Sequence, residues 1–376
     1  MVVSEFMRVK SVKLDSVVTS VATPNIAFTK YWGRRDESLN LPHNSTISMT
    51  LNETLRTTTS VAFSRSLSRD ALYINGEEQD PFTNEEIPTY IRKVLNIMRD
   101  MAGIDAKALV VSENSFPADV GLASSASGAA ALIHATSSAL QLDLEERELT
   151  KLARQICGSG GRSMIGGFAI WHRGYHPNGH DSYVEQIAPS TYWPDMIDVI
   201  AVVDRKAKKI SSPEGLKLTQ RTSRLYLSRP EIAEEASHNL LTAIKRKDFG
   251  EMAEIIMRDS NNMHATALDS WPPIFYMNDV SRNIVYAIHE LNEKHSGYVA
   301  AYTFDAGPNA HIITTGKHVG EIIGILNSIN GVVEIIEAGI GNGPRYETGP
   351  SNALIGPNLV PLLRSNGYFK KMHSDK

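Results

Sequence analysis

A glycine- and serine-rich stretch is the clearest candidate for chemistry in this sequence. Residues 121–127 read GLASSAS and open a run of small residues that extends to Leu140. Unpaired backbone N–H groups at a helix start, its dipole and nearby hydroxyls together suit a phosphate group. A serine-rich helix cap is the plainer alternative, and this stretch alone leaves both open. The candidate phosphate-binding residues are Gly121, Leu122, Ala123, Ser124, Ser125 and Ser127.

Two common nucleotide-binding motifs do not explain these glycines. The pattern Gly-x-x-x-x-Gly-Lys-Ser/Thr is missing, because residues 124–127 include no lysine. A second cluster, residues 157–163 (CGSGGRS), follows a helical pattern rather than a strand and has the wrong spacing for a dinucleotide fold. In this cluster Arg162 offers a planar fork for a carboxylate or phosphate. A helix end followed by a surface arginine is the alternative.

Two further segments place reactive side chains after expected strands. Residues 30–36 (KYWGRRD) combine three cations with two aromatic rings, although a solvated turn with core aromatics has the same composition. Asp305 ends an apolar strand immediately before the turn at Gly307 and Pro308. This carboxylate could act as a base or simply form the turn, and spacing does not decide between the two roles.

Other catalytic arrangements are poorly supported. His172, His176 and His180 recur every four residues, but the glycine and proline residues between them disfavour a helix, so we expect loop histidines rather than a metal site. The chain also lacks the Gly-x-Ser-x-Gly elbow of many serine hydrolases.

Composition narrows the class of protein. The 376 residues carry a net charge of -4, which gives no general attraction to nucleic acid or to an anionic membrane. Cys157 is the only cysteine, which is typical of a reducing compartment. No run approaches the roughly 20 apolar residues of a membrane span. We therefore expect a soluble cytoplasmic enzyme with a small-molecule substrate.

Hydrophobic periodicity predicts an α+β protein with two lobes, residues 1–205 and 206–376. The expected strands are 16–30, 46–63, 108–112, 168–171, 197–203, 298–305, 311–314 and 332–336. The expected helices are 84–102, 123–140, 144–156, 230–246, 249–259, 279–294 and 319–329.

In combination, these motifs resemble one family in the same order along the chain, over nearly all residues up to about 350. The sequence resembles the diphosphomevalonate decarboxylases, within the superfamily of galactokinase, homoserine kinase, mevalonate kinase and phosphomevalonate kinase (GHMP). The matching segments are 24–27, 30–36, 39–42, 112–117, 121–126, 158–163, 179–182, 211–212, 259–260, 278–279 and 302–310.

The resemblance implies a two-lobed GHMP-kinase-like fold with its active site in the cleft between the lobes. It also implies ATP-dependent conversion of mevalonate 5-diphosphate to isopentenyl diphosphate, ADP, phosphate and carbon dioxide, within the mevalonate pathway of isoprenoid biosynthesis. In that reaction the C3 hydroxyl is phosphorylated before the carboxylate is lost. The implied cofactors are ATP and Mg²⁺, with no magnesium ligand assigned, and the implied assembly is a homodimer.

The resemblance also implies roles for particular residues. Asp305 orients or deprotonates the C3 hydroxyl, Lys30 keeps this carboxylate ionised, and Arg162 grips the substrate carboxylate. ATP phosphates are expected over residues 121–127. The residues implied for the diphosphate are Tyr31, Arg34, Ser159, Arg162 and Ser212.

Two departures from the family pattern keep alternatives open. Cys157 stands where relatives often carry serine, which removes a good hydrogen-bond donor, and Arg34 stands where many carry lysine. The first departure leaves room for a mevalonate 5-phosphate decarboxylase. A mevalonate 3-kinase is a second alternative, although related 3-kinases lack the pair that Lys30 and Asp305 form. A third is a noncatalytic ligand-binding protein on the same fold.

Overall fold

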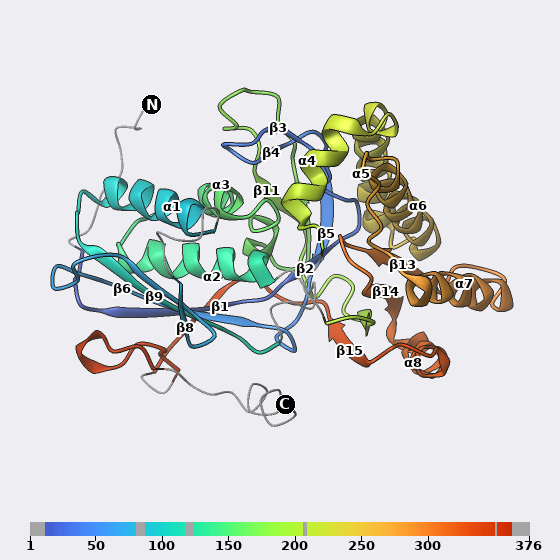
Figure 1. Ribbon diagram of the computed structural model, residues 1–376. Helices are drawn as coiled ribbons and strands as arrows, with labels where there is room; N and C mark the ends of the chain where they lie inside the picture. The colour runs from blue at the N-terminus through green and yellow to red at the C-terminus, as the bar shows by residue number, and fades with distance from the viewer. Residues whose placement is uncertain (1–11, 80–86, 117–123, 206–208, 350–351, 363–376) are drawn as a thin grey trace.

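The computed structural model describes residues 12–79, 87–116, 124–205, 209–349 and 352–362 (Figure 1). Three candidate phosphate-binding residues, Gly121, Leu122 and Ala123, lie outside the described residues. The structure is a mixed α and β fold, as expected, with three main sheets and a two-stranded hairpin among the described residues.

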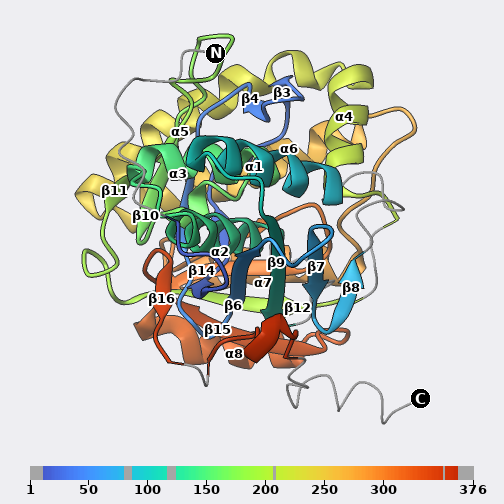
Figure 2. The same ribbon diagram turned by 90° about the vertical axis from the view of Figure 1, so that its left-hand side faces the viewer.

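The first sheet has six strands in the order β16-β1-β6-β9-β7-β8. Its strands are antiparallel apart from the parallel pair β7 and β9. Helices α1, α2 and α3 lie over one face of this sheet (Figure 2). The bounds are β1 Val17–Ala22, β6 Thr57–Ser64, β7 Ala71–Ile74, β8 Glu77–Gln79, α1 Ile87–Ala102, β9 Lys107–Asn114, α2 Ser124–Ala139, α3 Glu146–Ile156 and β16 Arg345–Glu347.

Helix α2 is the central helix that the small-residue run predicts. It packs on β1 and β6 and is itself packed against α3, so most of its residues are buried. Alanine and serine side chains let these backbones approach closely, and alanine also has the highest helix propensity. Helix α2, which begins at Ser124, is therefore held closely against the first sheet.

A second sheet has the order β11-β10-β5-β2, and a hairpin of β3 and β4 lies nearby in the chain. These strands are short, and β2, β5 and β10 are wholly buried. Their bounds are β2 Asn25–Ala27, β3 Arg34–Asp36, β4 Leu41–Pro42, β5 Thr46–Thr50, β10 Phe168–Trp171 and β11 Val184–Ala188.

The third sheet, β13-β14-β12-β15, carries the later helices. Helices α6 and α7 pack on β13 and α8 packs on β12, which explains why these strands are almost continuously apolar. The bounds are β12 Met196–Val202, α4 Ser212–Thr222, α5 Arg229–Arg246, α6 Phe249–Leu268, α7 Asp279–Lys294, β13 Ala300–Phe304, β14 Ala310–Thr315, α8 Val319–Ser328 and β15 Glu334–Gly339.

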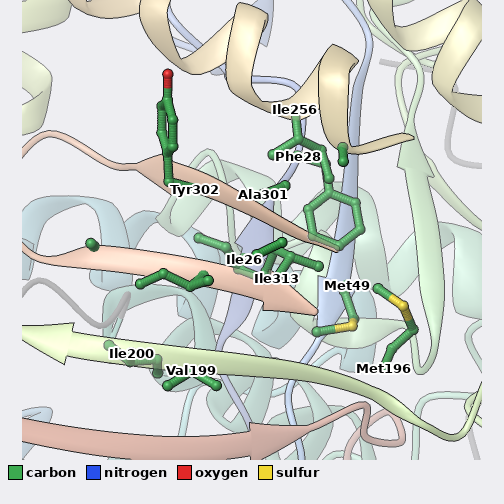
Figure 3. Packing of buried hydrophobic residues seen from close by; sticks show 14 of the residues in the cluster. Ile26, Phe28, Met49, Met196, Val199, Ile200, Ile256, Ala301, Tyr302 and Ile313 are labelled. Atoms are coloured by element: carbon green, nitrogen blue, oxygen red, sulfur yellow. The ribbon is translucent and has the colours of Figure 1, made fainter. Parts of the chain in front are cut away.

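One hydrophobic core joins the early and late parts of the chain. Phe28 and Met49 of the first part pack in the same cluster as Ile256, Tyr302 and Ile313 of the later part (Figure 3). A shared core holds β2 and β5 in a constant position against β13 and α6. The division near residue 205 stays a prediction.

Most of the elements predicted from periodicity are confirmed, with ends moved by a few residues. The strand predicted at 16–30 is two strands, because the chain breaks at Pro24, and the strand predicted at 46–63 is also two. The helix predicted to end at residue 259 continues to Leu268, where Met263 and Ala267 still bury one face. Among the described residues, no helix is long and apolar enough to cross a bilayer.

A half-buried histidine in α2 makes the stability of the fold depend on pH. The ring of His134 stacks on Tyr346 with 4.0 Å between centroids, and Ser20 Oγ lies 2.8 Å from its Nδ1. Burial lowers the pKa of His134 from 6.5 to about 4. The unfolded chain then binds the proton more readily than the folded chain between these two values.

We expect the free energy of unfolding to fall as pH drops from about 6.5 to 4, since protonation favours the unfolded chain in that window. The variant His134→Gln should show a shallower decline, measured by urea denaturation at several pH values. His238→Gln, at an exposed position of α5, is the matched control and should follow the wild type. Parallel profiles for His134→Gln and the wild type would contradict the assignment.

Candidate active site

The candidate site is built around a lysine–aspartate pair that joins distant parts of the chain. Lys30 Nζ lies 2.7 Å from Asp305 Oδ1. The lysine side chain is 2% exposed, whereas the aspartate is 34% exposed. The cation is therefore enclosed, and the carboxylate retains a face toward solvent on which a substrate could be placed. The expected pairing of these two residues is present.

Asp305 is held by the turn that follows β13. The N–H of Gly307 donates to the Asp305 carbonyl at 2.7 Å. Further along, Asn309 Oδ1 accepts the N–H of Val203 at 2.7 Å, and Ser281 Oγ donates to the Pro308 carbonyl at 2.7 Å. These contacts tie the turn to the end of β12 and to α7. The turn that the sequence predicts is thus a fixed support for the carboxylate.

Lys30 is held through its backbone by a buried ion pair. Asp259 of α6 accepts the Lys30 N–H at 2.6 Å, and Arg229 of α5 donates to the Lys30 carbonyl at 3.2 Å. Arg229 and Asp259 contact each other at 2.6 and 3.1 Å and are fully buried. A charge buried this deeply needs several partners. The Lys30 peptide groups supply some of them, so the ion pair and Lys30 order one another.

Arg162 lies beneath the candidate site and is almost completely buried. Its Nε donates to Asn25 Oδ1 at 3.0 Å and its Nη1 to Thr46 Oγ1 at 2.9 Å. Loss of solvent lowers the pKa of Arg162 to about 10, although the charge of Asp305 opposes this shift. The guanidinium therefore stays charged at neutral pH and is oriented by β2 and β5.

Tyr31 and Arg34 form a second polar group beside the pair. Arg34 Nε donates to the Tyr31 hydroxyl at 2.7 Å, and the Tyr31 ring packs against Trp171 with 4.9 Å between centroids. Burial raises the pKa of Tyr31 to about 12, so its hydroxyl keeps its proton at neutral pH. Gly158 lies against the same ring, which brings neighbouring Ser159 to this group.

Ser212 begins α4, a helix that the sequence analysis did not predict. Ser211 caps it and forms a reciprocal capping box with Glu214. The segment Ser-x-x-Glu with proline in the first turn was a usable signal. Gln220 of the same helix accepts the Arg34 N–H at 3.1 Å and donates to the Arg34 carbonyl at 2.7 Å. Helix α4 therefore also positions Arg34.

A small apolar cluster places α4 beside the lysine–aspartate pair. Trp32 and Ala306, which follow closely after the two members of the pair, are buried together with Leu216 and Tyr276. At Gly215 an added Cβ would lie 1.8 Å from the Tyr276 hydroxyl oxygen, so glycine permits this close approach. The start of α4 is thereby brought toward residues 30–36.

Cys157 connects the two glycine-containing segments. Its Sγ lies 3.4 Å from Ser125 Oγ and 3.2 Å from Ser159 Oγ. The start of α2 and the 157–163 segment therefore meet at this thiol. Ser125 is exposed, whereas Ser127 is fully buried and its hydroxyl lies 2.6 Å from Thr57 Oγ1.

The described residues include one group with metal-ligating side chains close together, and it lies where the end of α7 meets the start of α8 rather than at the pair. It consists of His295, His318 and Glu321. Glu321 already accepts Lys294 Nζ at 2.7 Å and lies 2.8 Å from His295 Nε2. These contacts make an ion-pair cluster, and we assign no metal to it. All three histidines of the 172–180 segment lie outside helices and strands, as predicted.

Two family models match the chain over most of its length. The diphosphomevalonate decarboxylase-like N-terminal domain matches residues 22–184, and the mevalonate 5-diphosphate decarboxylase C-terminal domain matches residues 198–348. The chain belongs to the diphosphomevalonate decarboxylase family. The resemblance noted from the sequence is confirmed.

Individual relatives agree with this assignment. The diphosphomevalonate decarboxylase mvd1 of Aspergillus fumigatus is 43% identical over 324 residues, which covers 83% of this chain and 80% of the relative. The crystal structure of mevalonate diphosphate decarboxylase from Staphylococcus aureus has a TM-score of 0.81 at 35% identity, covering 88% of this chain and 98% of that one. A structure of MDDEF in complex with MVAPP, AMPPCP and magnesium has a TM-score of 0.80 at 32% identity, covering 89% and 99%.

The structure therefore brings together the main side chains that the family resemblance leads us to expect. It also shows residues that support them and that were not predicted from the sequence. Lys30, Tyr31, Arg34, Arg162 and Asp305 lie in one connected region. The missed supports are Asn25, Gln220, Arg229 and Asp259. Asp259 fell within a recognised segment, but its contact with Lys30 spans 229 positions and leaves no local pattern.

The contact between Gly158 and Tyr31 can be tested directly. An added Cβ at Gly158 would lie 2.5 Å from Tyr31 Cε1, so Gly158→Ala must displace this ring. We expect a loss of about 1–3 kcal/mol in the free energy of unfolding, measured by urea denaturation. Gly324→Ala in α8 is the matched control, since no atom lies within 4 Å of the added carbon, and it should be neutral or stabilising. Equal stability of the wild type and Gly158→Ala would contradict the tight packing.

Proposed function

We propose that this chain catalyses the ATP-dependent decarboxylation of mevalonate 5-diphosphate to isopentenyl diphosphate, with release of ADP, phosphate and carbon dioxide. The observation that carries the proposal is the Lys30–Asp305 pair next to the buried cation of Arg162. Relatives named for this activity match the chain, and one solved relative is in complex with MVAPP, the ATP analogue AMPPCP and magnesium.

The partly exposed carboxylate of Asp305 is suited to the first step. It would accept a hydrogen bond from the C3 hydroxyl and orient the oxygen for phosphoryl transfer. A tertiary alcohol is a weak acid, so orientation contributes more than proton removal. Lys30 Nζ, 2.7 Å away, would hold this carboxylate in place and offset negative charge that gathers on the transferring group.

The second step needs a group that holds a carboxylate until it leaves. The C3–O bond breaks with its electrons passing to phosphate, and the C1–C2 electrons form the alkene as carbon dioxide departs. Arg162, oriented by Asn25 and Thr46, would hold the carboxylate before this cleavage. Its surroundings are water-poor, which strengthens the contact with a bound anion.

The remaining donors fit a diphosphate. Tyr31 and Arg34 are joined by a hydrogen bond. Ser159 is adjacent to Gly158, which contacts the Tyr31 ring, and Ser212 begins α4. With Arg162, these side chains would give the polyanion hydroxyl donors and two guanidinium groups. Arg34 supplies a planar fork, and its main chain is held by Gln220.

ATP phosphates and Mg²⁺ would be held at the segment that leads into α2. Ser124 and Ser125 stand at the helix start, where backbone N–H groups suit an anion. The buried hydroxyl of Ser127 would instead support this helix start through Thr57. Gly121, Leu122 and Ala123 belong to the same proposal. When bound, ATP supplies the phosphoryl group and Mg²⁺ neutralises charge on its phosphates.

We also propose two lobes divided near residue 205, a homodimer and a cytoplasmic location. The family resemblance supports the first two. A single cysteine, Cys157, supports folding in a reducing compartment.

Substrate choice tests the proposed function. Purified protein with Mg-ATP should convert mevalonate 5-diphosphate to isopentenyl diphosphate, with one ADP per alkene, when both products are followed together. Mevalonate and its 5-phosphate should give neither product at a comparable rate. Turnover of the monophosphate to isopentenyl phosphate would favour the alternative that Cys157 leaves open. ADP without alkene would indicate a kinase.

Asp305→Asn tests the role of the carboxylate without changing its size. We expect kcat to fall by about 100- to 10,000-fold, because the amide cannot accept the C3 proton and does not pair with Lys30. The melting temperature should fall, because the buried Lys30 loses its anionic partner, but the variant should still unfold in one cooperative transition. Asp143→Asn, at an exposed position, is the control and should keep full activity. Near-normal turnover by Asp305→Asn would remove this residue from the mechanism.

A further inference from the structure

Helix α6 contacts Lys30 and the residue directly before Asp305, so it supports both members of the lysine–aspartate pair. Asp259 accepts the backbone N–H of Lys30 at 2.6 Å. Ser260, the next residue, accepts the N–H of Phe304 at 3.0 Å, directly before Asp305 in the chain. One helical turn further on, His264 Nε2 lies 3.4 Å from the carbonyl oxygen of Phe304. One face of a single helix thus reaches both sides of the pair.

The position of β13 explains why side chains from a helix are needed there. Within the described part of the chain, β13 is an edge strand that pairs with β14 alone. In an antiparallel pair, alternate residues point both their N–H and their C=O away from the partner strand. At Phe304 these groups are buried and meet Ser260 and His264 instead of another strand. Unpaired buried backbone groups are costly, so these two side chains anchor the end of β13.

His264 is suited to donate this contact as a neutral ring. Its ring packs edge-on against Tyr276 and Phe304, at 6.2 and 6.1 Å between centroids. Burial and, to a smaller extent, the charge of Lys30 lower the pKa of His264 to about 4. A carbonyl oxygen can only accept, so Nε2 carries the proton of the neutral ring. This ring therefore adds a hydrogen bond without adding a second cation beside Lys30.

We propose that Ser260 and His264 are positioning residues, which set where the Asp305 carboxylate lies relative to Lys30. Asp259 fixes the lysine side of the pair, and Ser260 with His264 fixes the aspartate side. Because all three belong to α6, the separation of the pair is set by one rigid element. The effect on turnover rests on the proposed function, since rate depends on how accurately the carboxylate meets the C3 hydroxyl.

Two pairs of variants of the full-length enzyme separate positioning from general packing. Ser260→Ala removes the acceptor for the Phe304 N–H, and Ser260→Thr restores a hydroxyl. His264→Phe keeps the aromatic packing but loses the donor, and His264→Gln restores an N–H at a similar position. Asn261→Ala is the matched control on the same helix, because Asn261 contacts β13 at the Tyr302 hydroxyl, to which it donates at 2.9 Å, instead of at Phe304.

We expect Ser260→Ala and His264→Phe to lower kcat about 10- to 100-fold, with KM for both substrates within about threefold of the wild type. Ser260→Thr and His264→Gln should recover most of this loss, and Asn261→Ala should stay within about twofold. Crystal structures of the two impaired variants should show the Lys30 Nζ–Asp305 Oδ1 distance lengthened beyond about 3.5 Å.

The Lys30 Nζ–Asp305 Oδ1 distance in the crystal structures can be measured without any turnover, so it tests the positioning role separately from the proposed function. If the wild type turned over none of the mevalonate substrates, the proposed function would fail, and the variant structures alone would decide the positioning role. A pair still at hydrogen-bond distance in both impaired variants would overturn that role. An equal loss of kcat in Asn261→Ala would also overturn it, because general contact between α6 and β13 would then explain the effect.

Discussion

The contact between Lys30 and Asp305 is the constraint around which this structure is arranged. A lysine ammonium that is almost fully removed from water needs an anionic partner and fixed geometry. The partner comes from 275 positions later in the chain, so the early and late segments must be held in a fixed position relative to each other. The shared hydrophobic core that joins β2 and β5 to β13 and α6 holds them in that position.

The free-energy cost of burying Arg229 and Asp259 is offset because the two charges share hydrogen-bond partners. Arg229 and Asp259 are fully buried and bond to each other as well as to the Lys30 peptide groups. A pair of this kind contributes little net stability compared with apolar side chains of the same volume, because desolvation offsets the attraction. Its contribution here is specificity, because the strongest bonds available to both charges require Lys30 to occupy one position.

Neutral side chains hold the two arginines of the candidate site in place. Arg162 is held by neutral oxygens of Asn25 and Thr46 rather than by a carboxylate in direct contact. Its charge is therefore only partly compensated, and burial lowers its pKa. The guanidinium of Arg34 likewise donates to a neutral group, the phenol of Tyr31. A site with this imbalance stabilises an anionic ligand more than it stabilises the empty protein.

Local sequence patterns determined the α+β class, most helices and strands, the small-residue helix α2, the loop histidines and the residues matched to a family. These features depend on neighbours within a few positions, and side-chain periodicity records them. Helix α4 carries a local signal too, in its capping box, although it was not among the predicted helices. Only the tertiary structure decided that Asp259 holds Lys30, that Gln220 holds Arg34 and that Cys157 lies between Ser125 and Ser159. Each of these contacts joins segments far apart in the chain, except that between Cys157 and Ser159. Long-range contacts are set by how sheets and helices pack, and no spacing within one segment encodes them.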